Sequence, residues 1–280
     1  MKPRPFDYAR PDTVDEALAI LAEHGDDARV LAGGQTLMAM LNLRLVAPEV
    51  VVDITRIPEL DTIRELDGRI EVGAAVTQNR LMHWPALAEK LPLLAAALPF
   101  VGHFQTRNKG TVCGSVAHAD PASEIPLALA VLEGEVVLRS RQGTHGGTRV
   151  LAAGDFQQGM LATARAPDEL ITAVRFPVAN GPRSVAFREV ARRHGDFAIV
   201  AVAAAVESAK SIRLGVGGMT GRPAVRRIAA DGSASIKDAI ERLAWELEGH
   251  DDIHASARMR RDLLRRIGPV VIEEAIRCAA

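Results

Sequence analysis

Two segments of the chain carry the residue types that bind phosphate. Residues 32–36 read Ala-Gly-Gly-Gln-Thr, and residues 111–115, about 80 positions further on, read Thr-Val-Cys-Gly-Ser. Glycine lets a backbone approach an anion closely, and free N–H groups at a helix start donate hydrogen bonds to phosphate. Each segment alone is equally well explained by an ordinary turn, because neither matches GxGxxG or a Walker A loop. As a pair they indicate a clamp for a pyrophosphate.

Other patterns with chemical potential are weaker. His250 and His254 have the i,i+4 spacing of a helical metal site, but they precede an expected helix instead of lying in it. Ser115 and Ser123 lack the strand–turn–helix setting of a hydrolase nucleophile. A run of arginines is typical of a solvated helix face, with a partner-docking surface as the alternative; it comprises Arg258, Arg260, Arg261, Arg265 and Arg266.

The composition excludes several classes of protein. Cys113 and Cys278 are the only cysteines, which rules out a disulfide scaffold and a four-cysteine iron–sulfur or zinc site built from this chain alone. The 34 Lys and Arg residues nearly balance 35 Asp and Glu, which argues against nucleic-acid binding. No apolar stretch approaches the ~18–20 residues of a membrane span, and no signal-peptide pattern follows the basic N-terminus. We therefore expect a cytoplasmic protein.

Hydrophobic periodicity predicts the elements that must position the two phosphate-binding segments. A strand at 28–31 and a helix at 35–43 flank the first segment, whereas the second lies in an aperiodic stretch, 102–126, that is long enough to be a functional loop. Further strands are expected at 50–54, 135–139 and 170–176, a hairpin at 62–66 and 69–76 around Asp67-Gly68, and helices at 13–24, 77–83, 85–98 and 125–132.

The breakers Asn-Gly-Pro in residues 178–183 predict a domain boundary. Beyond it we expect strands at 184–190, 197–207 and 211–216, then helices at 235–248 and 255–278. Strands and helices mix without a steady β-α-β alternation, so the pattern favours an α+β fold over a doubly wound one. We expect one domain over 1–177, with subdomains at about 1–56 and 57–177, and a C-terminal domain over 184–280.

Several motifs together resemble one family along nearly the whole chain. AGGQT at 32–36 and RNKGTVCGSVAHADPASEIP at 107–126 are similar to the flavin-binding medium subunit of molybdenum hydroxylases, a family that includes carbon monoxide dehydrogenase and, as a fused relative, the flavin domain of xanthine dehydrogenase. The resemblance continues through PFDYARPDTVDEALAIL at 5–21, GDF at 154–156, APDEL at 166–170, RRHGDFA at 192–198 and HASARMRRDLL at 254–264.

The resemblance implies a fold and a set of cofactor contacts. The fold would be a two-subdomain FAD-binding domain of the vanillyl-alcohol oxidase-like (PCMH) type, followed by a smaller C-terminal domain. The two segments would hold the pyrophosphate through Ala32, Gly33, Gly34, Gln35, Thr36, Thr111, Cys113, Gly114 and Ser115. His118 and Glu124 match positions lining FAD, Glu124 as a partner for a sugar hydroxyl, and Leu161, Arg188 and Phe197 match positions near the flavin ring.

Two of these positions depart from the family pattern. Cys113 replaces a glycine of the second loop, so we expect a backbone there that tolerates a side chain, because a positive φ would cost on the order of 1 kcal/mol or more. A small buried residue is the favoured interpretation of Cys113, and a redox-active thiol is the alternative. Arg188 stands where related chains place Lys; it keeps the charge that could stabilise a reduced flavin, with a rearranged contact.

The resemblance also implies a division of labour among subunits. The chain would be the FAD-binding electron-transfer subunit, with molybdopterin on a large partner and [2Fe-2S] clusters on a small one, assembled as a dimer of heterotrimers. It would pass electrons from those clusters to an acceptor that is oxygen, a quinone or NAD. Two alternatives remain at this point: a free-standing FAD-dependent oxidoreductase with its own substrate, and a scaffold subunit that has lost FAD.

Overall fold

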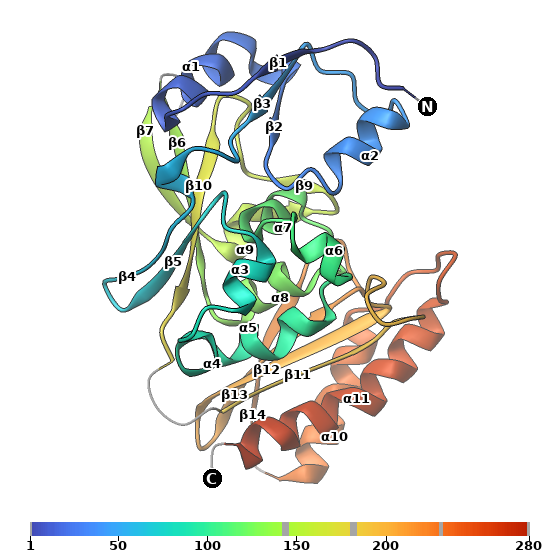
Figure 1. The fold of residues 1–280 in the computed structure, drawn as a ribbon. Coiled ribbons are helices and arrows are strands. Elements are labelled where there is room, and N and C mark those ends of the chain that lie inside the picture. The colour runs from blue at the N-terminus through green and yellow to red at the C-terminus, as the bar shows by residue number, and fades with distance from the viewer. Residues whose placement is uncertain (1, 142–145, 180–183, 230–231, 279–280) are drawn as a thin grey trace.

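A computed structural model describes residues 2–141, 146–179, 184–229 and 232–278. In Figure 1 the chain forms three tiers: an N-terminal sheet with its helices at the top, a larger sheet with a cluster of short helices in the middle, and a C-terminal sheet backed by two long helices at the bottom. Strands and helices are mixed and most pairings are antiparallel, which makes the fold α+β, as expected.

The N-terminal tier is a small parallel sheet that supports the segment 32–36. Its strand order is β1 (Asp7–Ala9), β3 (Val50–Asp53), β2 (Ala28–Leu31), and α1 (Val14–His24) packs on it. The expected start of α1 is confirmed, because the Thr13 side chain accepts a hydrogen bond from the Glu16 N–H. The segment 32–36 then connects β2 to α2 (Leu37–Asn42).

The middle tier is an antiparallel sheet of five strands. Its order is β4 (Ile63–Leu66), β5 (Arg69–Gly73), β10 (Leu170–Pro177), β6 (Glu135–Ser140) and β7 (Gly147–Ala152). The predicted hairpin is confirmed, with φ of 50° at Asp67 and 72° at Gly68, the two positive values that a tight hairpin turn requires. Strand β7 carries no sequence signal that predicted it, because its side chains are mostly exposed.

The helices of the middle tier correct two expectations. The prediction of a single helix at 85–98 is wrong. Pro92 lacks the N–H that a continuous helix needs at this position, and it begins a new helix instead. The stretch 102–126 is not an aperiodic loop: Thr111 caps a helix, and Ala119 ends it with φ of 52°. The helices are α3 (Gln78–Met82), α4 (Leu87–Lys90), α5 (Pro92–Ala97), α6 (Phe104–Arg107), α7 (Val112–His118), α8 (Glu124–Val131) and α9 (Ala153–Phe156).

The C-terminal tier is an antiparallel meander with helices on both faces. The strands β11 (Val185–Val190), β12 (Val200–Ser208), β13 (Ser211–Gly217) and β14 (Ala224–Ala229) pair in chain order. The long helices α10 (Ser233–Glu246) and α11 (Ala257–Arg277) cover one face, and α5 and α8 cover the other (Figure 1). A Cβ on Gly215 would lie 2.2 Å from Val131 Cγ2, so this glycine permits α8 to lie against β13.

The packing of this sheet bears on the expected boundary. Ala201 and Ala203 belong to the core of the preceding residues, whereas Val202 and Ala204 belong to the core formed with α10 and α11. The sheet is therefore a layer between two cores. Part of the predicted boundary, residues 180–183, lies outside the described residues.

A few short elements complete the fold. A two-stranded ribbon of β8 (Gln157–Gly159) and β9 (Ala162–Thr163) lies near α7 (Figure 1). Strand β12 begins at Val200, three residues after the expected start, so Phe197 lies in the connection that precedes it. None of the helices in the described ranges is both long and apolar enough to cross a membrane.

Candidate functional site

A cleft of about 560 Å³ lies where the three tiers meet. Its volume falls within the range of small-molecule and cofactor sites. The N-terminal segment 29–37, the middle helices and the connection 195–197 all contribute to its walls. Twelve of the fourteen residues named from the sequence line it: Ala32, Gly33, Gly34, Gln35, Thr36, Thr111, Cys113, Gly114, Ser115, His118, Glu124 and Phe197.

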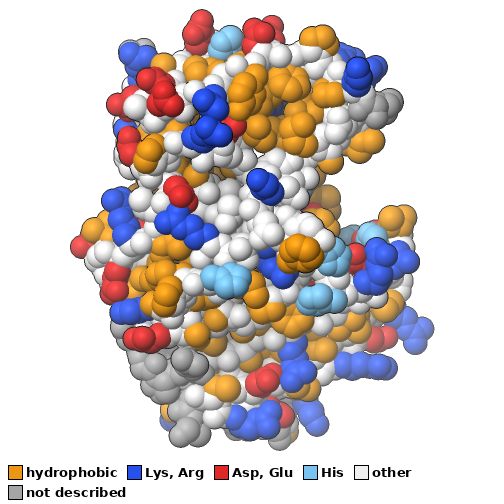
Figure 2. Space-filling model, viewed as in Figure 1, with side chains coloured by type: hydrophobic (Ala, Val, Ile, Leu, Met, Phe, Trp, Pro, Cys, Tyr) orange, Lys and Arg blue, Asp and Glu red, His pale blue; other side chains and the backbone are white. Residues whose placement is uncertain are grey.

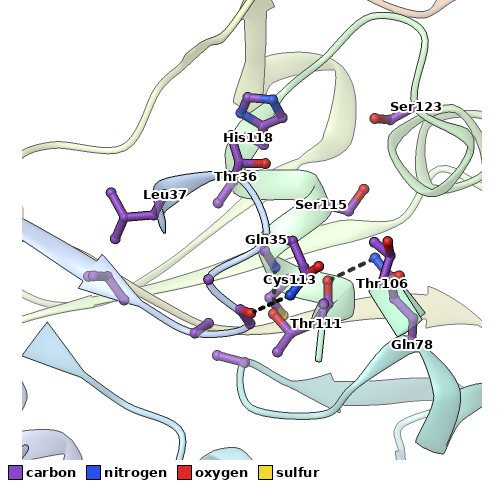
Figure 3. Close-up of a pocket in the computed structure, with 18 of the residues that line it drawn as sticks. Gln35, Thr36, Leu37, Gln78, Thr106, Thr111, Cys113, Ser115, His118 and Ser123 are labelled. Atoms are coloured by element: carbon purple, nitrogen blue, oxygen red, sulfur yellow. Dashed lines mark hydrogen bonds between the residues drawn. The ribbon is translucent and has the colours of Figure 1, made fainter. Parts of the chain in front are cut away.

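The segment 32–36 meets the residues just before the segment 111–115 through backbone atoms. A Cβ on Gly33 would lie 2.3 Å from the Lys109 carbonyl oxygen and 2.5 Å from Gly110 Cα, so only glycine fits. Gly34 has a φ of 69°, which also favours glycine. The Gln35 side chain folds back and donates to the Gly33 carbonyl at 3.3 Å (Figure 3). The two segments are thus brought to one cleft, as the sequence predicted.

The second segment is fixed by local hydrogen bonds. Thr111 Oγ1 accepts from the Gly114 N–H at 2.9 Å, and the Val112 N–H donates to the Val76 carbonyl at 3.1 Å. Thr111 also pairs with Thr77 in an isolated antiparallel bridge. Figure 3 shows the Thr111, Ser115 and His118 side chains on the same wall, with Gln35 and Thr36 of the first segment beside them.

Cys113 lies beneath this wall with its side chain inside the core. Its φ is not positive, so the backbone tolerates a side chain, as expected. The residue is 3% exposed, and its thiol donates a weak hydrogen bond to the Val72 carbonyl at 3.4 Å. Burial raises the pKa of this thiol well above its ordinary value. A protonated, enclosed thiol has the properties of a packing residue and not of a redox centre.

One buried carboxyl group lines the cleft, and a second, half-buried one interacts with it. Glu124 begins α8 and is 4% exposed; burial, reinforced by the charge of Asp120, raises its pKa to about 7. Behind it, Glu189 of β11 has one carboxyl oxygen that is enclosed and makes no hydrogen bond. Burial and then repulsion from Glu124 raise the pKa of Glu189 to about 8. Sequence reasoning missed Glu189, because nothing in a strand pattern indicates which carboxyl group meets another.

The remaining two predicted residues lie outside the cleft lining. Arg188 points to α11, where its Nε donates to Glu274 Oε2 at 2.9 Å, and it is half-exposed. Leu161 turns the β8–β9 ribbon with φ of 54°, and its N–H donates to the Ala119 carbonyl at 3.1 Å while its side chain is exposed. Phe197 lines the cleft with its side chain 59% exposed.

The structure adds cleft residues that no motif marked. Arg165 donates to the carbonyls of Ala166 and Glu169 at 2.9 and 2.7 Å, and burial lowers its guanidinium pKa. Gln78 and Arg29 also line the cleft. No sequence motif marks Gln78 as a cleft residue. It lies near Thr111 only because the fold brings Thr77 and Thr111, which are far apart in the sequence, side by side. The His250 ring lies 3.6 Å from Asp252, whose carboxylate also pairs with Arg260 at the start of α11.

A cleft lined by two glycine-containing segments with hydroxyl and amide side chains has the character of a site for an anionic cofactor. Residues 4–179 match the family described as the FAD binding domain in molybdopterin dehydrogenase. The chain belongs to this family and is therefore an FAD-binding oxidoreductase, the flavoprotein subunit of a molybdenum hydroxylase. Its resemblance to medium subunits, inferred from the motifs, is confirmed.

Curated relatives and solved structures agree with this assignment. The chain is 36% identical to the 6-hydroxypseudooxynicotine dehydrogenase complex subunit alpha of Paenarthrobacter nicotinovorans, over 95% of this chain and 92% of that protein. It is 42% identical to the caffeine dehydrogenase subunit beta of Pseudomonas sp. strain CBB1, over 71% and 66%. Quinoline 2-oxidoreductase from Pseudomonas putida 86 contains a chain that superimposes with a TM-score of 0.89 and 32% identity, over 100% of this chain and 99% of that one.

Proposed function

We propose that the cleft holds FAD with its pyrophosphate between the segments 32–36 and 111–115. The observation that carries this is the backbone contact of Gly33 with Lys109 and Gly110, which sets two amide-rich segments against one cleft. A ligand with two phosphates suits these segments. They have glycine where no Cβ fits, they offer hydroxyl and amide donors, and neither contains a carboxylate.

We assign the rest of the cleft by chemical complementarity. Gln35, Thr36, Thr111 and Ser115 can donate to phosphate or sugar oxygens. Glu124 and His118 face the same space and suit sugar hydroxyls, and Arg165 adds positive charge at the wall. Leu161 and Phe197 stay in the proposal as residues near the flavin ring, Phe197 with the most support because it lines the cleft, whereas Arg188 is left out because its side chain pairs with Glu274 of α11.

The bound flavin would supply electron transfer from partner clusters to an external acceptor, and this chain would bind, orient and enclose it. The chain has two cysteines, one of them enclosed, so a cluster with four thiolate ligands has to reside on another subunit. We propose a large molybdopterin-binding partner and a small [2Fe-2S] partner in a dimer of heterotrimers.

We further propose the domain division and the fold type. The FAD-binding domain would span 1–177, with subdomains at about 1–56 and 57–177 of the vanillyl-alcohol oxidase-like (PCMH) type, and the C-terminal domain would span 184–280. The separate parallel sheet of the first tier and the antiparallel sheet of the second support the two subdomains. The shared core at β12 predicts that the C-terminal domain does not separate on its own.

Purification of the chain, alone and with its co-purifying proteins, tests this function. We expect a flavin absorption spectrum with one FAD per chain, together with a large and a small partner. A yellow protein that turns over a substrate without partners would favour a free-standing oxidoreductase. A colourless protein that cannot be reconstituted with FAD would favour a scaffold subunit.

A further inference from the structure

Gln78 is a buried amide at the back of the second phosphate-binding segment. It is the first residue of α3, follows the N-cap Thr77, and is 5% exposed. Although it lines the cleft, its carbonyl oxygen Oε1 is enclosed and makes no hydrogen bond. Burial of an amide with one unpaired oxygen costs free energy, so a residue that fulfils only a packing role here would be better apolar.

Gln78 engages two consecutive carbonyl groups. Its backbone N–H donates to the Gly110 carbonyl at 2.8 Å, and its Nε2 donates to the Thr111 carbonyl at 3.4 Å (Figure 3). A flipped amide would set Oε1 against the Thr111 carbonyl, so the donor orientation is the one that the contact allows. Gln78 therefore contacts both carbonyl oxygens, Gly110 through its main chain and Thr111 through its side chain; the Thr111 carbonyl also accepts from the Ser115 N–H at 3.2 Å.

The Gln78 side chain packs closely against the backbone of Gly110. A Cβ on Gly110 would lie 3.2 Å from Gln78 Oε1 and 3.3 Å from Nε2, and 3.0 Å from the Thr106 carbonyl oxygen. The side chain thus presses on the backbone of Gly110 from one side, while Gly33 approaches it from another. Rotation of the Gly110–Thr111 peptide would break its hydrogen bond with the Gln78 N–H, and the Gln78 side chain packs against the same backbone.

The orientation of these peptides decides the electrostatics of the segment. A phosphate is attracted by N–H groups and repelled by carbonyl oxygens, so one rotated peptide changes a donor into an obstacle. We propose that Gln78 is a positioning residue for the pyrophosphate: it fixes the Gly110 and Thr111 carbonyls so that the second segment presents donors to the cofactor. This inference rests on the proposed binding of FAD in the cleft.

The test uses the full chain with Gln78→Met, which keeps the length of the side chain and removes its hydrogen bond to the Thr111 carbonyl, while the backbone N–H of residue 78 still donates to the Gly110 carbonyl. Gln157→Met is the matched control, because Gln157 is 3% exposed, has an unpartnered Nε2 and does not line the cleft. The measurements are the Kd values for FAD and for riboflavin, which lacks both phosphates, and the ³¹P NMR spectrum of bound FAD. Gln78→Asn serves as a second variant whose shorter amide cannot reach the Thr111 carbonyl.

We expect Gln78→Met and Gln78→Asn to weaken FAD binding about ten-fold, the upper end of the effect of one lost hydrogen bond. Riboflavin binding should change less than about two-fold, the ³¹P signals should shift, and Gln157→Met should alter neither. Unchanged FAD affinity and ³¹P signals in both Gln78 variants, or an equal loss for FAD and riboflavin, would overturn the proposal. Failure of the unmodified chain to bind FAD would instead refute the proposed function.

Discussion

The contact of Gly33 with Lys109 and Gly110, just before the segment 111–115, makes Gly33→Ala the most informative substitution. The added Cβ would lie 2.3 Å from the Lys109 carbonyl oxygen and 2.8 Å from its carbonyl carbon. Both are backbone atoms, so no side chain can rotate away to relieve the overlap. The segment 32–36 and the residues before Thr111 must separate by roughly 1 Å to restore ordinary van der Waals contact.

The expected magnitude follows from the site of the overlap. Overpacking costs about 1–3 kcal/mol in a well-packed interior, and here the strain falls on the two walls that would grip the pyrophosphate. If FAD binding requires the unstrained arrangement, its Kd should rise by about 5- to 150-fold. Gly154→Ala is the control, because a Cβ on Gly154 meets no atom within 4 Å and its φ is not positive.

Fluorescence titration of the apoprotein with FAD provides the assay, because binding in an enclosed site changes flavin emission. Thermal unfolding of both apo variants reports whether the chain still folds. We expect Gly33→Ala to weaken FAD binding within the stated range and Gly154→Ala to leave it unchanged. Full FAD affinity in folded Gly33→Ala would refute the reasoning that the two segments must touch to form the site.

Three further predictions concern particular side chains. Because the pKa values of Glu124 and Glu189 are raised to about 7 and 8, the folded chain keeps protons that the unfolded chain releases near pH 4–5. The free energy of unfolding should therefore fall as pH rises from about 5 to 8, and E124Q/E189Q should flatten that fall; urea titrations at several pH values measure it. Cys113 is enclosed and Cys278 is exposed, so a thiol reagent should modify one thiol in the native chain and two in denaturant. Rapid modification of both thiols in the native chain would instead support the alternative that Cys113 is reactive. Arg188→Ala removes an exposed ion pair with α11 and should cost less than about 1 kcal/mol, and a shifted flavin midpoint potential would show that Arg188 acts on the flavin after all.

The sequence could predict features that depend on local chemistry. Thr13 and Glu16 predicted the start of α1, and Asp67-Gly68 predicted the hairpin, because helix capping and a positive φ each depend on a few adjacent residues. The clusters of glycine and hydroxyl residues at 32–36 and 111–115 also indicated that the two segments share a site, and both line one cleft. The presence of Cys113 in place of glycine also predicted correctly that φ is not positive there, because a positive φ is costly for a residue with a side chain.

The sequence could not predict features that depend on distant partners. The α7 helix, which contains Cys113, is short, and its outer face forms the cleft wall, so it lacks the apolar period of a surface helix. Gln78 and Glu189 gain their contacts only in the folded chain, where Gln78 lies against Thr111 and Glu189 interacts with Glu124. Arg188 shows the limit of positional analogy, because the orientation of β11 turns its side chain toward α11.

A structure of the purified chain with FAD bound would show directly whether the cleft is the cofactor site. We predict the pyrophosphate between Gly33-Gly34 and Thr111–Ser115, with the cofactor extending along the cleft past Glu124. The claim would be contradicted if FAD occupied another surface of the chain, or if its phosphates lay outside the space between these two segments.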